Sequence, residues 1–536
     1  MPTFSKIRQI LPKVRSGFRA DACCVLVGLF LSFIGNFHYG YSTTFLNTPV
    51  DEFKDFLNKS LSHGANHPSA GTIDVWWNLV LNIPFAGFFF GLFLNPLLND
   101  KFGRKVGFLT GSLGSLISAI LRFTSIWWEH IGLLVFARIL TSLCTAATYS
   151  SLLLYLQECA PTHLRGTLTF LSEVVFASMC LLGMLLGTDQ LLGKNLLALT
   201  AVPIAPCLFF LVALFFFPET PKFLFLVKND RVKAARSIRF YHGQKADVDT
   251  ILEEMAQEAE SKELPSFLKT CRIVLRTDHT RNAFILSVVC LQNCVGMWSL
   301  LLSSTYFLEQ SDVPSTVAEW GSNAMMAAYI AGTIGGAVLI DVYGRRPLLI
   351  TFTIINVGSL ASLVIFDQLH HLADWVKWGC LPALIVYGIS YGLAVGPISW
   401  FICNELTPMQ FRSCVQSLSY AVNTLIVVGL SFAVLPLYDA IGSWAFLPLY
   451  PLYRDVRASS WSTANVISNI CAFLKIGLPF VFLLFTPGLW KKTDYIWEKP
   501  RLSYLGDYLL VLKSDMDYRY SSAFPQLNRA DLDHLM

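Results

Sequence analysis

Two charged stretches far apart in the chain have the same spacing. Each has an acid, a glycine three residues later and an arginine directly after that glycine: Asp100, Gly103 and Arg104 in "NDKFGRK", and Asp341, Gly344 and Arg345 in "DVYGRR". The planar guanidinium of arginine offers several donors at once, so it can bind a carboxylate or the carbonyl groups at a helix end. Such residues suit a contact that forms in one state of a protein and breaks in another.

A second pair of motifs repeats in the same order. In both, a glutamate is followed by a proline and then by an arginine: Glu158 and Arg165 in "ECAPTHLR", and Glu405 and Arg412 in "NELTPMQFR". Two motifs that repeat in one order indicate a chain built from two related halves. The alternative is that each basic motif merely keeps a helix end on the cytoplasmic side of a membrane, where lysine and arginine are enriched.

Long apolar segments separate these motifs. Hydrophobic side chains make up 54% of the chain and charged ones 14%, which is more apolar surface than a soluble core can bury. A helix needs about 20 apolar residues to cross a bilayer. Twelve segments reach roughly this length: 22–45, 75–98, 105–125, 130–157, 167–190, 193–217, 282–307, 317–340, 347–366, 378–404, 413–438 and 463–486. We therefore predict an all-α integral membrane protein with twelve transmembrane helices in two six-helix bundles.

The basic residues predict the orientation of these helices. Residues 1–21, the loops "DKFGRK" and "YGRR" and the segment 222–281 are basic or rich in charge, and all fall on one side. Basic loops stay in the cytoplasm, so we expect both termini there. The predicted parts are a cytoplasmic N-terminus (1–21), a first bundle (22–217) with an extracellular loop (46–74), a cytoplasmic linker of short amphipathic helices (218–281), a second bundle (282–486) and a cytoplasmic tail (487–536). No role is assigned to the loop 451–462.

Five motifs resemble those of the facilitative glucose transporters of animals, in the sugar-transporter branch of the major facilitator superfamily. They are "GNFHYGYSTTFLNTP", the pair "NDKFGRK" and "DVYGRR", "ECAPTHLRG", "PETPKFL" and "GPISWF", and the likeness extends from residue 22 to about 440. The resemblance implies passive transport of a hexose or similar sugar by alternating access, with the solute site between the halves. It also implies a location in the plasma membrane.

The resemblance assigns roles to several residues. It implies that Arg104 meets Glu158 or the region of Arg165, and that Arg345 meets Glu405 or the region of Arg412, as a latch at the cytoplasmic end. It places sugar-contacting side chains at Gln292, Asn293, Trp400 and Asn423. Amides and an indole suit the hydroxyl groups and the apolar ring face of a sugar. The alternative is that the amides bond between helices and that the indole simply packs.

Four positions depart from the family pattern. A glutamine on the fifth helix is replaced by Glu173, asparagines on the seventh and eighth helices by Trp298 and Tyr329, and a glutamate on the tenth helix by Gly392. Several partners for the hydroxyl groups of a hexose are therefore missing or enlarged. These changes keep open another polar solute, such as a polyol or an organic acid, and also a nutrient sensor that does not transport.

Two charges inside predicted helices need partners, because an ionisable group in a membrane is costly. Arg138 has a counterpart in the family, whereas Glu173 does not. Proton-driven relatives carry an acid where this chain has Ser42, so we expect uniport. Three roles remain open for Glu173: an ion pair with Arg138, a contact to the solute, or a relocated proton site.

The remaining motifs give few further functions. "NKS" makes Asn58 a predicted N-glycosylation site on the outer side. No phosphate-binding loop, HExxH or CxxC motif is present in the sequence, so we expect no enzyme activity, no cofactor and no metal site. The net charge of +4 gives no reason to expect a nucleic-acid partner. The expected partners are a small-molecule solute and the lipid bilayer, and the oligomeric state is left open.

Overall fold

The computed structural model describes residues 3–62, 69–161, 165–243, 247–260, 267–292, 294–343, 345–370, 373, 375–407 and 409–443. The chain divides into two units, 1–481 and 482–536, and all described residues belong to the first. Every regular element in the described ranges is a helix, as predicted. The predicted twelfth helix (463–486), the loop 451–462 and the tail 487–536 lie outside the described residues.

The helices fall into three successive sets. The first set is α1 (Thr3–Thr44), α2 (Val50–Leu61), α3 (Ala70–Pro96), the π-helix η1 (Leu97–Phe102), α4 (Arg104–Trp127), α5 (Ile131–Cys159), α6 (Arg165–Leu186), α7 (Leu196–Ala201) and α8 (Ile204–Phe215). The second is α9 (Pro221–Leu226), α10 (Arg231–His242), α11 (Val248–Glu260) and α12 (Phe267–Arg276). The third is α13 (Asp278–Gln292), α14 (Val295–Gln310), α15 (Ser315–Tyr343), α16 (Arg345–Leu369), η4 (Val376–Gly379), α17 (Cys380–Ser390), the π-helix η5 (Tyr391–Val395), α18 (Gly396–Leu406) and α19 (Met409–Ile441).

Three predicted helices are interrupted. The predicted helix 193–217 is divided into α7 and α8 at Pro203, whose ring removes a backbone donor. The predicted helix 282–307 is divided into α13 and α14, and α14 itself has a kink at Ser303, where φ is −144°. The predicted helix 378–404 contains a π-helical turn over η5. Hydrophobic periodicity detects apolar length, but it does not register these local breaks.

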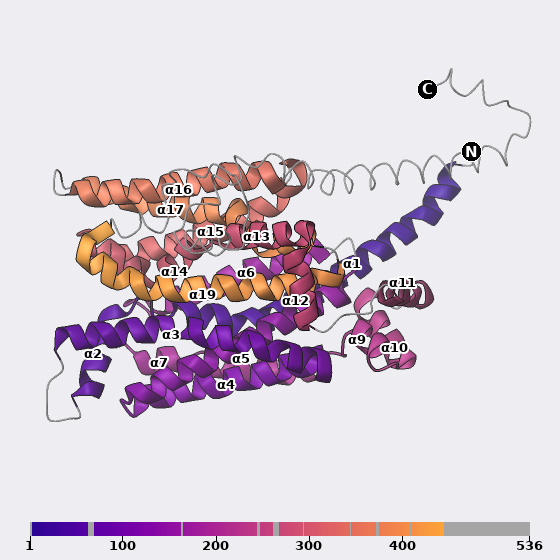
Figure 1. Cartoon of the computed structure of the whole chain (residues 1–536), viewed down its shortest axis with the longest axis horizontal. Coiled ribbons are helices and arrows are strands. Elements are labelled where there is room, and N and C mark those ends of the chain that lie inside the picture. Colours follow the sequence, from indigo (N-terminus) through magenta and orange to yellow (C-terminus); the bar gives the residue numbers. More distant parts are fainter. Residues whose placement is uncertain are drawn as a thin grey trace, which may run out of the picture. The chain divides into compact units, whose positions relative to one another are not determined.

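Long apolar helices dominate the described chain. Within the described residues, nine helical stretches have the length and composition to cross a membrane. In the first set, α5 packs against both α3 and α4, and α6 packs along α1 (Figure 1). We call α1 and α3–α8 the N-terminal group. In the third set, α17 packs against α15 and α16, and α19 packs against α13. We call α13–α19 the C-terminal group.

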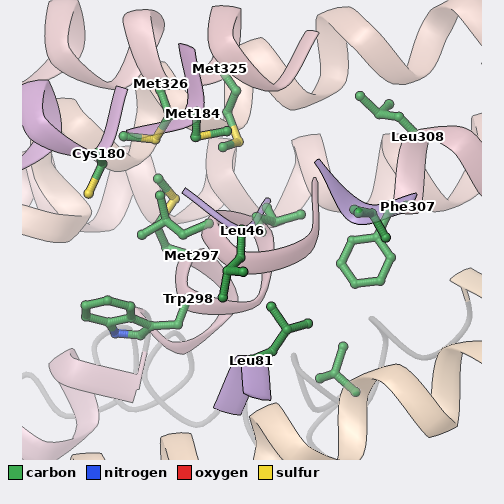
Figure 2. Packing of buried hydrophobic residues seen from close by; sticks show 14 of the residues in the cluster. Leu46, Leu81, Cys180, Met184, Met297, Trp298, Phe307, Leu308, Met325 and Met326 are labelled. Atoms are coloured by element: carbon green, nitrogen blue, oxygen red, sulfur yellow. The ribbon is translucent and has the colours of Figure 1, made fainter. Parts of the chain in front are cut away.

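The two groups meet along two seams, where α6 packs on α15 and α3 packs on α19. Sulfur-bearing side chains gather at the first seam: Cys180 and Met184 come from α6, and Met325 and Met326 come from α15 (Figure 2). Methionine has a flexible, polarisable side chain that adapts to irregular contacts. This seam is therefore suited to small shifts of one group against the other.

The helices of the middle set, α9–α12, are short and lie within residues 218–281, the range predicted as the cytoplasmic linker. Leu252 and Met255 of α11 are buried, and Leu252 packs with Ala234 and Ile238 of α10. Helix α10 also contacts α1 (Figure 1). We call the end of the N-terminal group that carries α9 and α10 the linker end, and the opposite end, next to α2, the α2 end.

Candidate functional site

Arg104 and Glu158 form an ion pair at the linker end. The Arg104 Nη2 atom lies 2.9 Å from Glu158 Oε1, its Nε donates to the same oxygen at 3.0 Å, and its Nη1 donates to the Asn99 carbonyl at 3.1 Å. The hydroxyl of Thr220 donates to the other carboxylate oxygen at 2.6 Å. One guanidinium therefore joins the start of α4 to the end of α5, and Glu158 continues this network to the residue before α9.

Glu219 extends this network. Its two carboxylate oxygens accept from the backbone N–H of Lys105 at 3.1 and 3.0 Å. Gly103 has a φ of +116°, and a Cβ there would meet the Glu219 carboxylate, so glycine is required at this position. Burial raises the pKa of Glu219, while the N–H groups of Thr220 and Lys105 act in the opposite direction. The motifs "NDKFGRK" and "PETPKFL" thus contact each other.

Most of the other predicted latch residues, from both halves, have side chains that are not described. Arg345 is the first residue of α16. Gly344 is not among the described residues, and the side chains of five further predicted residues are not described: Asp100, Arg165, Asp341, Glu405 and Arg412. Their part in a latch stays a prediction.

Arg138 is buried and bonded to backbone carbonyls. Its Nε donates to Val80 at 2.9 Å, Nη1 to Ser42 at 2.8 Å and Nη2 to Leu81 at 3.2 Å. It thereby ties α5 to α1 and α3. The structure does not bring Arg138 and Glu173 together, because Glu173 accepts instead from the hydroxyl of Tyr329 at 2.5 Å. Of the three roles considered for Glu173, the ion pair with Arg138 is therefore absent from this structure.

The structure contains a second buried arginine, to which the sequence assigned no role. Arg122 of α4 is 1% exposed, and its Nη2 lies 2.9 Å from Nε2 of His38 on α1. Its guanidinium lies 5.1 Å from the Phe45 ring centroid, and that of Arg138 lies 5.8 Å from the same ring, at distances typical of cation–π contacts. The signal was present in the sequence, since Arg122 lies inside the predicted helix 105–125 and His38 inside 22–45.

A central cavity lies where the two groups face each other. Residues of both groups line it. The N-terminal group contributes polar side chains that include Ser42, Thr141 and Thr145, and the C-terminal group contributes Trp400 and Asn423. This cavity offers hydroxyl and amide groups beside aromatic surfaces.

The residues predicted to bind sugar lie at or beside this cavity. Trp400 and Asn423 line it, and Gln292 Nε2 lies 3.5 Å from Asn423 Oδ1. The Oε1 atom of Gln292 is buried and has no hydrogen-bond partner among the described residues. Tyr420 holds the backbone of Trp400 by donating to its carbonyl at 2.8 Å. Asn293 lies outside the described residues.

Glu173 lines a second cavity, which we call the Glu173 cavity. Four aromatic residues line both cavities: Tyr39, Phe88, Trp298 and Trp400. The Trp298 ring packs edge-on against Phe85 and Phe176, with ring centroids 5.6 and 6.3 Å away. Trp298 therefore lies between a compartment with Arg138 and one with Glu173.

Asn47 joins the two groups at the α2 end. Its Nδ2 donates to Ser304 Oγ at 2.8 Å, and its Oδ1 accepts from the backbone N–H of Thr305 at 3.3 Å. Ser304 in turn donates to Ser322 at 2.8 Å. The backbone N–H of Asp189 donates to Glu319 at 3.4 Å, again from one group to the other. These bonds link the two groups at this end.

Asn58, the predicted glycosylation site, is exposed on α2. The other required residue of its motif, Ser60, accepts a hydrogen bond from the backbone N–H of Ile131 at 2.9 Å. The side chain of Asn58 is therefore accessible at the α2 end, whereas that of Ser60 helps to attach α2 to the start of α5.

Two family models match the chain. The model described as "Sugar (and other) transporter" matches residues 27–452, and the model described as "Transmembrane protein 231" matches residues 445–536. The first match covers all the described residues of the two groups from residue 27 onward. The second overlaps the end of the first over residues 445–452 and covers the predicted twelfth helix and the tail.

Curated relatives agree with the first match. The chain is 27% identical to the mouse solute carrier family 2, facilitated glucose transporter member 7, over 81% of this chain and 85% of that protein. It is 26% identical to the mouse facilitated glucose transporter member 5, over 76% of this chain and 82% of that protein.

Solved structures show the same fold. The proton:xylose symporter XylE bound to 6-bromo-6-deoxy-D-glucose has a TM-score of 0.65 and 16% identity, and the match covers 80% of this chain and 91% of XylE. The inward-open conformation of XylE from E. coli has a TM-score of 0.62 and 17% identity, over 79% and 93% of the two chains. At this level of identity the likeness shows the fold.

Proposed function

Because the chain belongs to the family of sugar (and other) transporters, we propose that it carries a hexose or a similar sugar across a membrane by facilitated diffusion. It is an integral, multi-pass membrane protein with the fold of the major facilitator superfamily, and its relatives are transporters rather than enzymes. The observation that carries the proposal is the central cavity between the two groups, in which an indole and an amide from the C-terminal group face hydroxyl groups from the N-terminal group.

In this proposal the cavity residues have distinct roles. Trp400 covers the apolar face of the sugar ring, since an indole packs well on such a surface. Asn423 and the unpartnered Oε1 of Gln292 bond to sugar hydroxyl groups. A buried amide oxygen without a partner costs free energy in the empty protein, and a bound sugar would recover it.

Transport proceeds by alternating access in this proposal. The bonds of Asn47 to Ser304 and Thr305 form the gate at the α2 end, on the extracellular side. The ion pair of Arg104 with Glu158 belongs to the latch at the cytoplasmic linker end. A carrier of this kind must release one set of contacts before it opens the other.

The proposed mode is uniport. Arg138 donates to three backbone carbonyls, one of them that of Ser42, the residue at the position where proton-driven relatives carry an acid. These carbonyl groups accept the hydrogen bonds of the Arg138 guanidinium. Because backbone carbonyls do not titrate near neutral pH, they cannot carry a proton across the membrane. Sugar flux should therefore follow the sugar gradient and should not respond to a proton gradient.

We propose a topology of twelve transmembrane helices with both termini in the cytoplasm, in the plasma membrane, with the part boundaries predicted from the sequence. The match of residues 445–536 to a different family makes the twelfth helix the part to test first. A protease site placed after residue 536 should be cleaved from the cytoplasmic side. Loss of a glycosidase-sensitive mobility shift in Asn58→Gln would locate α2 outside.

The function is tested by uptake into sealed liposomes that contain the purified protein. Labelled glucose, fructose and galactose are compared, with and without an inward proton gradient, in the wild type and in Trp400→Ala. We expect saturable, stereoselective uptake that ignores the gradient and falls at least tenfold in the variant. Absence of uptake of every sugar by folded protein would refute the proposal, and uptake that requires the gradient would refute uniport.

A further inference from the structure

The Glu173 cavity combines one carboxylate with an aromatic wall. Eight of its eleven lining residues are aromatic, and Glu173 is the charged residue among them. The rings come from both groups, with Tyr39, Tyr149 and Phe176 on one side and Tyr329 and Tyr391 on the other. Their centroids lie close together, at 4.8 Å for Tyr39 and Phe176 and at 5.1 Å for Tyr329 and Tyr391. Aromatic side chains therefore form most of the wall around the Glu173 carboxylate.

The carboxylate of Glu173 has a polar partner but no ion-pair partner in the described part of the chain. The hydroxyl of Tyr329 donates to it at 2.5 Å, and this bond crosses from the C-terminal to the N-terminal group. A phenol can stabilise a carboxylate, but it does not neutralise the negative charge. The donors of Arg138 are directed to carbonyl groups and do not reach Glu173. Glu173 is half-buried in a predicted membrane helix, where an unpaired carboxylate is costly, and a cation would offset this cost.

Aromatic faces favour the same kind of ligand. The π-system of tyrosine and tryptophan attracts cations, and rings arranged around a carboxylate recognise ammonium groups. A neutral sugar could donate a hydroxyl to Glu173, but it would leave the negative charge uncompensated in a surrounding of low polarity. A protonated amine compensates the charge and also gains from the rings.

Resting on the proposed transport function, we propose that the Glu173 cavity binds the protonated amine of an amino sugar, whose ring occupies the adjoining central cavity. Tyr39, Trp298 and Trp400 line both cavities, so one solute can contact both compartments. Asn423 then bonds to the hydroxyl groups of the ring, as proposed for a hexose. The replacement of amide positions by Glu173 and Tyr329 changes the preferred solute from neutral to cationic.

The test compares a 2-amino-2-deoxyhexose with its parent hexose in proteoliposomes at pH 7. We expect the wild type to transport the amino sugar with a kcat/KM at least tenfold above that of the parent. Glu173→Gln should reduce this preference ratio at least tenfold, because the amide keeps the size but loses the charge. Glu52→Gln, a change at a partly buried carboxylate on α2, should leave the ratio within twofold. Equal ratios in the wild type and Glu173→Gln would overturn the proposal.

Failure of transport as such can be separated from failure of this inference. If neither sugar enters the liposomes, the proposed function fails, and binding decides the inference. The amino sugar should then raise the Tm of the wild type in detergent by several degrees, and it should not raise that of Glu173→Gln. An equal shift in both proteins, or none in the wild type, would overturn the inference. If the parent hexose is transported and the amino sugar is not preferred, the function stands and the inference is wrong.

Discussion

Gly392 of η5 packs closely against the backbone carbonyl of Tyr329 on α15. A Cβ built on Gly392 would lie closer to this oxygen than real contacts allow, and 2.9 Å from the backbone nitrogen of Thr333. The position therefore cannot hold a larger side chain without a shift of α15 or η5. The family resemblance implies a glutamate at this position, and glycine there permits the close packing of α15 against η5.

Gly392→Ala should destabilise the protein. Overpacking against a backbone typically costs about 1–3 kcal/mol, which exceeds the gain of about 0.5–1 kcal/mol from alanine in a helix. Gly358→Ala on α16 is the matched control, because a Cβ there meets nothing within 4 Å. Thermal unfolding in detergent should show a lower Tm for Gly392→Ala and an unchanged or higher one for Gly358→Ala. A Tm for Gly392→Ala at or above that of the wild type would contradict this packing.

Crosslinking at the α2 end should stop transport. Asn47 and Ser304 are in direct contact, so the double variant Asn47→Cys with Ser304→Cys places two thiols within reach of each other. Oxidation should abolish sugar uptake, because the gate can no longer open, and reduction should restore it. Each single variant, treated identically, is the control. Full uptake with a complete disulfide would show that these contacts do not need to separate.

Arg104→Lys should slow transport about tenfold or more. Lysine is a point charge and loses the fork that now reaches Glu158 and the Asn99 carbonyl, and hydrogen bonds to charged groups contribute about 1.5–3 kcal/mol each. Lys101→Arg, at an exposed neighbouring position, is the control. Initial uptake rates at saturating sugar give the comparison. Equal rates in Arg104→Lys and the wild type would remove Arg104 from the latch.

Glu219 should make stability depend on pH. Burial raises its pKa above the ordinary value of 4.5, so the folded protein holds more protons at this group than the unfolded chain does. Its contribution to stability is therefore present at low pH and is lost as pH rises from about 4.5 through the folded pKa. The difference in Tm between the wild type and Glu219→Gln should change in that direction, and Glu254→Gln, exposed on α11, should show no such difference. A difference that grows in favour of the wild type with rising pH would contradict the sign.

The sequence predicted the helical segments and the contact of two charged motifs more accurately than the central site. Apolar length identified the segments, because crossing a membrane requires it, and the family resemblance led to the pair of Arg104 and Glu158, which the structure contains. The hydrophobic pattern did not predict the helix breaks at Pro203 and Ser303. These breaks depend on local backbone geometry, whereas the periodicity averages over many residues.

Side-chain direction limited the prediction of the site. Arg138 and Glu173 were considered as a pair because both are charged and lie in helices, but Arg138 turns to carbonyl groups and Glu173 to Tyr329. Arg122 was passed over within an apolar segment, although it packs on His38. Neither outcome follows from residue type, since each depends on which neighbours a fully packed helix presents.

Counterflow tests the central claim most directly. Liposomes with the purified protein are loaded with unlabelled hexose and diluted into a trace of labelled hexose without any proton gradient. A carrier with alternating access should accumulate label transiently above equilibrium, because the outward flux of unlabelled sugar returns the binding site to the outer side. We expect this overshoot in the wild type and its loss after oxidation of the Asn47→Cys and Ser304→Cys double variant. Label that rises to equilibrium without an overshoot, or that does not enter at all, would contradict a facilitative sugar carrier.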